Sequence, residues 1–237
     1  MGVIKFAGRS SEDFRVVVEH YPDYPTPERN VETVAVPGRN GDLHFDGGNF
    51  RNYSQRYDVY LSALKDGLPT VAENAAAWLL APVGYQRLED SYNPDVFRMA
   101  YFAGPMDIAS VFNRFGRITL EFVCKPQRWL KIGEETVSIA ASGAVISNPT
   151  AFAALPYIKV YGSGAGELSV GQITCTLHDI DEYIELDSDL QNAYKATENK
   201  NSTVSIPQFP VLQPGDNAIA WTGGITAVEI VPRWWTL

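Results

Sequence analysis

The 237-residue sequence predicts a mainly β protein of two domains, with one short helix in the first domain. Three observations carry this prediction. Alternating polar and apolar residues, as in residues 57–62, have the period of a half-buried strand. Turn signals recur at short intervals through the second half, and helical periodicity is confined to residues 70–81. We therefore expect an amino-terminal β-sandwich-like domain over residues 1–130 and a carboxyl-terminal β-sandwich domain over residues 131–237.

The first part of the chain predicts strands on either side of a proline-rich connector. Strand periodicity runs through residues 14–19 and reappears at residues 57–62. Residues 21–30 hold three prolines within six positions, which excludes a central strand and favours an extended surface segment. After the Pro37-Gly38 break, Asn40-Gly41 is the pair that a type I′ turn requires, because both central residues then have positive φ. We expect a tight hairpin at this position.

The one helix is predicted over residues 70–81. Thr70 and Glu73 have the spacing of a capping box, and Pro82 ends the helix. A helix of this length is not stable alone in water, so it must pack on the β core with Trp78 as its main anchor. Its apolar stripe consists of Val71, Ala75, Trp78 and Leu79.

Further strands are expected on both sides of the domain boundary. The charged cluster and Gly133 that follow Pro126 place this boundary within residues 127–140. In the second domain, six or seven short strands are separated by turn signals, which is the pattern of a β-sandwich. The first-domain strands cover residues 85–90, 96–102, 109–111 and 116–123, and the second-domain turns include residues 162–166, 171, 213–216 and 223–224.

Residue spacing predicts no catalytic centre, no metal site and no cofactor. The three histidines, His20, His44 and His178, have no metal-ligand spacing with the two cysteines. No serine is placed near a histidine by the sequence, and the Gly162–Gly166 segment precedes a strand rather than the helix that a phosphate-binding loop requires. We expect a protein that is not an enzyme.

An acidic cluster follows His178 in the second domain. Clustered carboxylates suit a calcium site or a glycosidase pair. Residues 177–182 nevertheless have the composition of a polar hairpin tip, and the alternation over residues 183–187 places Glu185 and Asp187 on the solvent face of a strand. We favour the structural interpretation, with weak calcium binding as an open alternative.

Charge and hydropathy exclude several classes of protein. The net charge of -9 argues against a general nucleic-acid binder, whose affinity comes from a basic surface. The longest nearly apolar run, residues 75–83, is too short to cross a bilayer, and the amino terminus has no hydrophobic signal region. We expect a protein that is made in a cytoplasm, where Cys124 and Cys175 are buried free thiols.

Two sets of short motifs carry a family resemblance. The first half has Pro37-Gly38-Arg39-Asn40-Gly41, Asp46-Gly47-Gly48, Trp78-Leu79 and Phe122-Val-Cys124-Lys-Pro126. The second half has Asn148-Pro149, residues 157–162, residues 183–187, Phe209-Pro210, residues 214–217 and residues 228–233. Together they resemble the distal tail proteins (Dit family) of long-tailed, siphovirus-type bacteriophages and prophages, over nearly the whole chain. The Phe122–Pro126 ending departs from the family pattern by inserted residues.

The resemblance implies a structural role. In this family the first domain forms a six-membered ring and the second, galectin-like β-sandwich domain lies on its periphery. Such a ring joins the tail tube to the tail tip or baseplate and lets DNA pass. It also holds receptor-binding proteins. The resemblance thus implies a homo-hexameric baseplate hub of the virion, assembled in the host cytoplasm, that binds neither nucleic acid specifically nor a membrane.

Eight residues are predicted to contact neighbouring subunits or partners. The proline connector and the Asn-Gly hairpin are expected to reach a neighbour, and the terminal tryptophans are expected to lie in a final strand or an interface. A carbohydrate-binding β-sandwich protein is the alternative, because aromatic residues make up 12% of the chain and can stack on sugars. The eight residues are Pro25, Pro27, Arg39, Asn40, Gly41, Asp42, Trp234 and Trp235.

Overall fold

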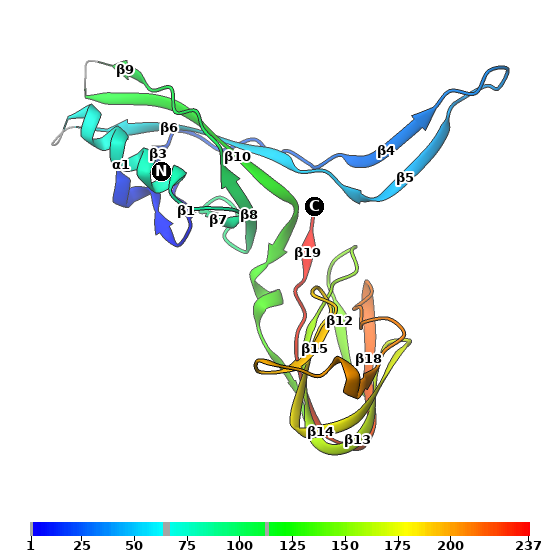
Figure 1. Ribbon diagram of the computed structural model, residues 1–237. Coiled ribbons are helices and arrows are strands. Elements are labelled where there is room, and N and C mark those ends of the chain that lie inside the picture. The colour runs from blue at the N-terminus through cyan, green and yellow to red at the C-terminus, as the bar shows by residue number, and fades with distance from the viewer. Residues whose placement is uncertain (1, 64–66, 112–113) are drawn as a thin grey trace. The chain divides into compact units, whose positions relative to one another are not determined.

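The computed structural model describes residues 2–63, 67–111 and 114–237 and confirms a mainly β protein (Figure 1). The chain divides into two compact units. Unit 1 comprises the residues up to Arg128 together with Leu237, and unit 2 comprises Trp129–Thr236. This division falls within the range of residues 127–140 expected for the boundary and two residues before the expected domain limit at residue 130.

Unit 1 is built on an antiparallel sheet in the order β2-β1-β7-β8-β10-β6-β3, with β9 also paired to β10. The long β6–β10 pairing joins Phe115 to Ser62 at one end and Cys124 to Tyr53 at the other. Alternate side chains of these two strands enter the core, as the sequence pattern predicts. The strands are β1 (Ile4–Phe6), β2 (Arg9–Ser10), β3 (Val16–Val18), β6 (Tyr53–Ser62), β7 (Gln86–Asp90), β8 (Val96–Phe102), β9 (Ala109–Val111) and β10 (Phe115–Leu130).

Helix α1 (Leu68–Leu80) begins earlier than expected. Gly67 occupies the N-cap with a φ of 77°, and Pro69 lies in the first turn, so the capping box expected at Thr70 is wrong. A capping box does occur before the short 3-10 helix η1 (Ser11–Phe14), where Ser10 caps the first turn. The helix ends before Pro82, as predicted.

Trp78 attaches α1 to the core of unit 1. Its ring stacks on Phe14 at a centroid distance of 4.8 Å and meets Phe6 edge-on at 6.5 Å. The indole N–H donates a hydrogen bond to the carbonyl oxygen of Phe6 at 3.1 Å. Only 3% of Trp78 is exposed. Trp78 is the largest of the α1 side chains that cover the core, and Leu68, Val71, Ala75 and Leu79 are buried beside it.

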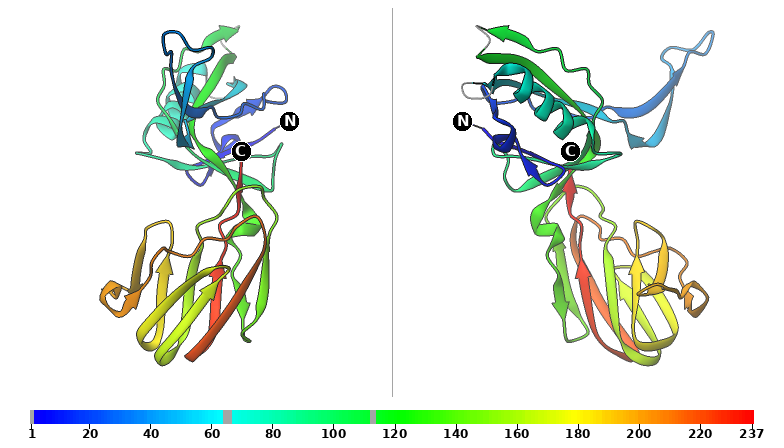
Figure 2. Two further views of the ribbon diagram at one scale, coloured as in Figure 1. Left: turned by 90° about the vertical axis from the view of Figure 1, so that its right-hand side faces the viewer. Right: turned by 60° about the vertical axis from the view of Figure 1, so that its left-hand side comes forward.

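Unit 2 is a single curled sheet that packs around its own core (Figure 2). Its order is β11-β18-β13-β14-β15-β16, with β12 on β18 and β17 on β14. Two short 3-10 helices, η2 (Lys131–Glu134) and η3 (Asn201–Thr203), complete the unit. The strands of this sheet are β11 (Val137–Ile139), β12 (Ala144–Asn148), β13 (Tyr157–Val170), β14 (Ile173–Asp187), β15 (Asn192–Lys195), β16 (Glu198–Asn199), β17 (Val204–Ser205) and β18 (Gly215–Val231). β19 (Trp235–Thr236) belongs to the same unit but pairs with β10 instead.

Three expected turns in unit 2 are instead parts of continuous strands. β13 runs through Gly162–Gly166, β18 runs through Gly223-Gly224, and β14 runs through the expected hairpin tip at residues 177–182. Both glycine segments lie where β13 and β18 shift register. A Cβ atom on Gly224 would approach the carbonyl oxygen of Ser163 to 1.8 Å, so glycine permits this close backbone approach.

Both cysteines are free and buried, as expected. Cys124 belongs to unit 1 and Cys175 to unit 2. Burial raises the pKa of the Cys124 thiol to about 12 and that of Cys175 to about 11. Neither thiol is therefore a nucleophile near neutral pH.

Trp78→Ala is expected to reduce the free energy of unfolding by roughly 3–5 kcal/mol, because it leaves a large cavity between α1 and the sheet. Denaturant unfolding measures this change. Leu80→Ala is the matched control, since Leu80 lies on the same helix and is 50% exposed. A loss below about 1 kcal/mol for Trp78→Ala would refute the anchoring role.

Candidate functional site

The candidate interaction site is a hairpin of residues 29–50, which we call the arm. β4 (Arg29–Val34) and β5 (Leu43–Phe50) pair with each other in a two-stranded sheet of their own (Figure 1). Most side chains on both strands are exposed. A two-stranded hairpin with no core is marginally stable in water, so a surface that covered the arm would stabilise it.

One face of the arm is mainly apolar, although it also carries Glu32. Val34 pairs with Leu43 and Glu32 pairs with Phe45, and strand alternation places these four side chains on the same face. Phe45 is 55% exposed and Val34 is 41% exposed. His44 lies on the opposite face and provides a matched position for mutation.

The tip of the arm is a loop over residues 35–42. The Arg39 N–H donates to the carbonyl oxygen of Val36 at 3.1 Å, and Gly38 has a φ of 79°. Proline followed by a positive-φ glycine is the signature of a type II turn at Pro37-Gly38. The expected type I′ turn at Asn40-Gly41 is wrong, because Gly41 has positive φ and Asn40 does not. The predicted contact residues Arg39, Asn40, Gly41 and Asp42 are all exposed in this loop.

The root of the arm, residues 21–28, is an extended segment without a strand, as predicted. Tyr21 packs against the Tyr92 ring at 4.4 Å and donates its hydroxyl to the Tyr92 carbonyl oxygen at 3.1 Å. The Gln55 side-chain amide donates to the carbonyl oxygen of Asp23 at 3.0 Å. Pro27, a predicted contact residue, is buried. The root is thus held in place by other residues of unit 1.

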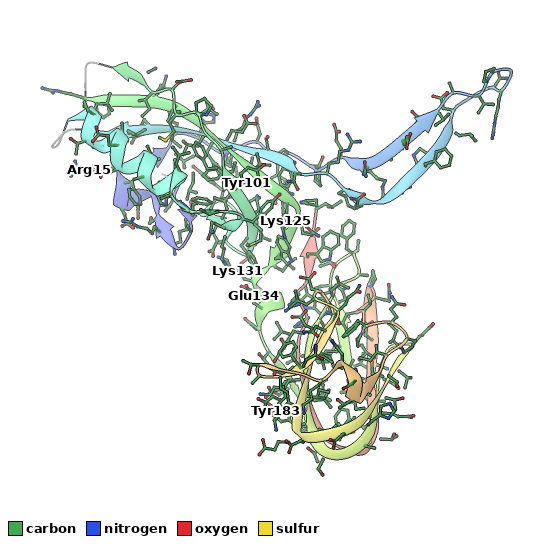
Figure 3. The ribbon with its side chains drawn as sticks, in the orientation of Figure 1. Arg15, Tyr101, Lys125, Lys131, Glu134 and Tyr183 are labelled. Carbon is green, nitrogen blue, oxygen red and sulfur yellow. The ribbon has the colours of Figure 1, made fainter. Side chains whose placement is uncertain are left out.

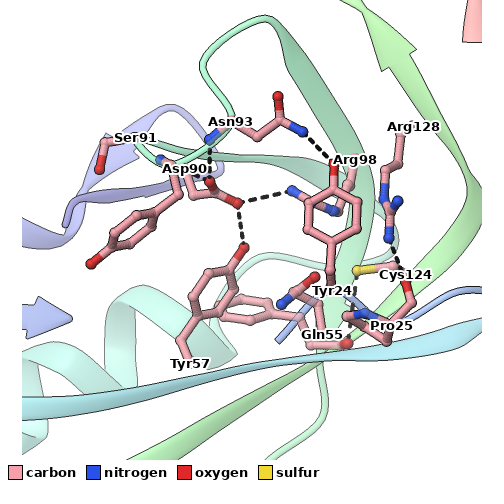
Figure 4. Close-up of polar contacts among 12 residues, drawn as sticks. Tyr24, Pro25, Gln55, Tyr57, Asp90, Ser91, Asn93, Arg98, Cys124 and Arg128 are labelled. Carbon is pink, nitrogen blue, oxygen red and sulfur yellow. Dashed lines mark hydrogen bonds and ion pairs between the residues drawn. The ribbon is translucent and has the colours of Figure 1, made fainter. Parts of the chain in front are cut away.

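Arg128 and Asn93 hold the next part of the root (Figure 4). Arg128 Nη2 donates to the carbonyl oxygen of Pro25, and its guanidinium lies 4.1 Å from the centroid of the Tyr24 ring. Asn93 Nδ2 donates to the Tyr24 hydroxyl. Arg128 also donates through Nε to the Tyr53 hydroxyl at 3.4 Å. Pro25, another predicted contact residue, is therefore engaged within its own unit.

A buried ion pair lies beneath this root (Figure 4). Arg98 Nη1 and the Tyr57 hydroxyl donate to the same Asp90 oxygen at 2.9 and 2.8 Å. The backbone N–H groups of Tyr92 and Asn93 donate to the other oxygen at 3.0 and 2.9 Å. The side chains of Arg98 and Asp90 are each only 2% exposed. Four donors thus satisfy the buried carboxylate.

The network shifts the protonation equilibria of its members. Burial and the adjacent Asp90 carboxylate raise the pKa of Tyr57 well above its usual range, so its hydroxyl stays protonated and donates. Burial alone would lower the pKa of Arg98, but Tyr57, Tyr53 and Asp90 outweigh it and raise that pKa. Arg98 is therefore cationic at all relevant pH values.

Sequence reasoning missed Asp90, Arg98 and Arg128. A signal for Arg98 was present, because Val96, Arg98 and Ala100 share one face of β8 and that face is buried. A charged residue at an inward position requires a buried partner. Arg128 carries no such local signal, since its partner Pro25 lies 103 positions away.

The terminal tryptophans pack within unit 2. Trp234 is 5% exposed, and its carbonyl oxygen accepts a hydrogen bond from the Leu130 N–H at 2.8 Å. Trp235 stacks on Phe152 at 4.5 Å and donates its indole N–H to the Ala153 carbonyl oxygen at 2.9 Å. β19 provides a final strand at Trp235, whereas Trp234 directly precedes that strand.

Asp187 holds this carboxyl-terminal segment. Both of its oxygens accept hydrogen bonds from Arg233 at 2.8 Å, and the Asp189 and Leu190 amides donate to Oδ1. Burial raises the pKa of Asp187, but Arg233 and the two amides outweigh it and leave the pKa below its usual value. Asp187 was expected on a solvent face, and this is wrong, because it is 3% exposed.

One histidine does approach a serine. His178 Nε2 lies 2.8 Å from Ser205 Oγ, because β14 and β17 are neighbours, so the expectation that no serine lies near a histidine is wrong. Both side chains are on the exposed side of the strands. Within the described ranges, no carboxylate is hydrogen bonded to this imidazole, so the pair lacks the third member of a catalytic triad.

Two exposed acidic residues of unit 2 share one lysine. Lys195 pairs with Asp181 at 2.9 Å and with Glu182 at 3.2 Å. In the part of the chain that the structure describes, no three or more His, Cys, Asp or Glu side chains are placed to hold a metal ion. No described helix has the length and apolarity needed to cross a membrane.

The fold can be compared with known proteins. No protein-family model matches the sequence, and no curated protein matches it. Among solved structures, the chain is similar to SPP1 Dit (gp 19.1), described as a paradigm of the hub adsorption apparatus in phages that infect Gram-positive bacteria. The TM-score is 0.78 with 12% sequence identity, and the likeness covers 100% of both chains. The fold is therefore Dit-like.

Arg98→Met is expected to lower the free energy of unfolding by roughly 3–5 kcal/mol, because it leaves the Asp90 carboxylate buried without its cation. Chemical denaturation measures the loss. Arg56→Met is the control, since Arg56 pairs with Glu121 but is 63% exposed, and it should cost less than about 1 kcal/mol. Equal losses for the two variants would contradict the role given to the buried pair.

Asp187→Asn is expected to weaken the dependence of the free energy of unfolding on pH in the acidic range. The folded-state pKa of Asp187 is depressed, so its contribution is present above the unfolded pKa of about 4 and is lost as pH falls through the folded pKa. Near pH 7 the variant should lose roughly 2–4 kcal/mol. Urea unfolding from pH 2 to 7 tests this, with Asp189→Asn as the exposed neighbouring control. If the free energy of unfolding depends on pH in the same way in wild type and in Asp187→Asn, the role given to Asp187 is refuted.

Proposed function

We propose that this protein is a distal tail hub protein of a long-tailed phage or prophage. The observation that carries the proposal is the end-to-end structural likeness to SPP1 Dit, a hub protein. In this proposal the protein is a structural part of the virion, between the tail tube protein and a tail tip or baseplate protein. It has no catalytic task.

The arm gives the proposed hub a means of self-association. In a closed head-to-tail ring, the same surface of every subunit contacts a different surface of its neighbour. An exposed hairpin with an apolar face suits such a contact, because covering Val34, Leu43 and Phe45 removes apolar area from water. A hexameric ring would leave a central opening for DNA, and the net charge of -9 disfavours DNA binding there. Receptor-binding proteins would attach to the same hub.

The native mass in solution tests self-association. Light scattering on a sizing column should give about six times the 26.2 kDa mass of one chain at high protein concentration. Phe45→Ser should shift the mass toward one chain, because it removes the largest exposed side chain of the apolar face. The free energy of unfolding should change by less than about 1 kcal/mol, since Phe45 is not in the core.

His44→Ser is the matched control for Phe45→Ser, on the same strand and the opposite face. It should leave the assembly intact. Equal dissociation by both variants would contradict a contact made through the apolar face. A monomer for wild type at every concentration would contradict self-association of the isolated chain.

Glycan binding is the second candidate function. Tyr161 and Tyr183 are cross-strand neighbours on the outer face of unit 2, and Lys159 lies 4.0 Å from the Tyr183 ring centroid (Tyr183 is labelled in Figure 3). Partly exposed rings beside charged groups suit sugar recognition. A monomer that binds glycans, and loses binding on Tyr161→Ala and Tyr183→Ala, would favour this function over the hub.

A further inference from the structure

Arg128 occupies an unusual position for a cation. The residue is 1% exposed, and it ends the continuous segment of unit 1 that precedes unit 2. Burying a guanidinium is costly unless several partners replace the lost water. Its partners are of two kinds. Tyr53 belongs to the core strand β6, whereas Tyr24 and Pro25 belong to the root of the arm.

The planar shape of the guanidinium explains why an arginine is present. One edge donates to the Pro25 carbonyl oxygen, Nε donates to the Tyr53 hydroxyl, and one face lies 4.1 Å from the Tyr24 ring centroid. A lysine ammonium is a point charge and offers neither the fork nor the flat face. Arg128 therefore restrains position and orientation together.

The core side of this contact is itself held by hydrogen bonds. The Tyr53 hydroxyl also accepts a hydrogen bond from Arg98 at 3.1 Å, and Arg98 is paired with Asp90. The Asp90 carboxylate in turn accepts the backbone N–H of Asn93, whose side chain donates to the Tyr24 hydroxyl. Two routes thus connect the buried ion pair to the same tyrosine of the root.

We propose that Arg128 is a positioning residue that fixes the root of the arm to the core of unit 1, so that the arm is pre-organised before it meets a partner. Its importance for assembly rests on the proposed hub function. Pre-organisation lowers the conformational entropy lost on association. Each subunit of a ring would then present its arm in the same way.

Distance measurement between two spin labels by double electron–electron resonance tests the restraint directly. Spin labels at Thr33→Cys in the arm and Glu73→Cys on α1 report the arm-to-core distance, and both positions are exposed. The native thiols are buried and do not compete for the label. Labelled chains are diluted into unlabelled chains, so that only distances within one chain are measured.

In the wild-type background the distance distribution should be narrow. Arg128→Met and Arg128→Lys should each broaden the distribution by at least about twofold. Neither side chain combines hydrogen bonds to Pro25 and Tyr53 with stacking on the Tyr24 ring. Arg117→Met is the control, since Arg117 is an exposed arginine that pairs with Glu19, and it should leave the width unchanged.

Tyr24→Leu keeps the experiment decisive if the Arg128 variants do not fold. Tyr24 is 57% exposed, so its replacement removes the stacking surface and the Asn93 bond without opening the core. It should also broaden the distribution while the thermal midpoint stays near that of wild type. An unchanged width in Tyr24→Leu and in the folded Arg128 variants would overturn the proposal.

Native mass measured on the same samples separates the two proposals. Broadened distances with monomeric wild-type protein would support the role of Arg128 and contradict the ring. A hexamer whose arm distances do not respond to Arg128 or Tyr24 substitution would support the ring and contradict this role.

Discussion

The Asp90 carboxylate is the buried charge on which the arrangement of unit 1 depends. It joins Tyr57 on β6, Arg98 on β8 and the turn after β7, which are distant in sequence. A buried ion pair persists only when its remaining hydrogen-bonding capacity is also satisfied. Apolar packing tolerates exchange of one hydrophobic residue for another, whereas this network tolerates few alternatives. It therefore specifies how these strands lie against one another.

The same constraint extends to the surface through Tyr53. Its hydroxyl accepts hydrogen bonds from Arg98 and Arg128, and Arg128 holds Pro25 at the root of the arm. The arm beyond this root has an uncovered apolar face. A well-packed core that carries an exposed, marginally stable element is expected in a protein that assembles through that element.

Local patterns in the sequence predicted local structure. The strand at residues 96–102 was predicted because alternation is a property of neighbouring residues. The Gly162–Gly166 segment was misassigned because glycines serve turns and bulges alike, and only the partner strand distinguishes the two. In the candidate site, a hairpin was predicted at the tip from its turn residues, but the turn lies at Pro37-Gly38 and not at Asn40-Gly41. The restraint of the arm by Arg128 was not predicted, because that contact joins residues 103 positions apart and depends on the folded sheet.

Electron microscopy of the purified chain at high concentration tests the hub assignment most directly. The account predicts closed, six-membered rings with an open centre. Particles of single-chain size at every concentration, with no rings, would contradict it.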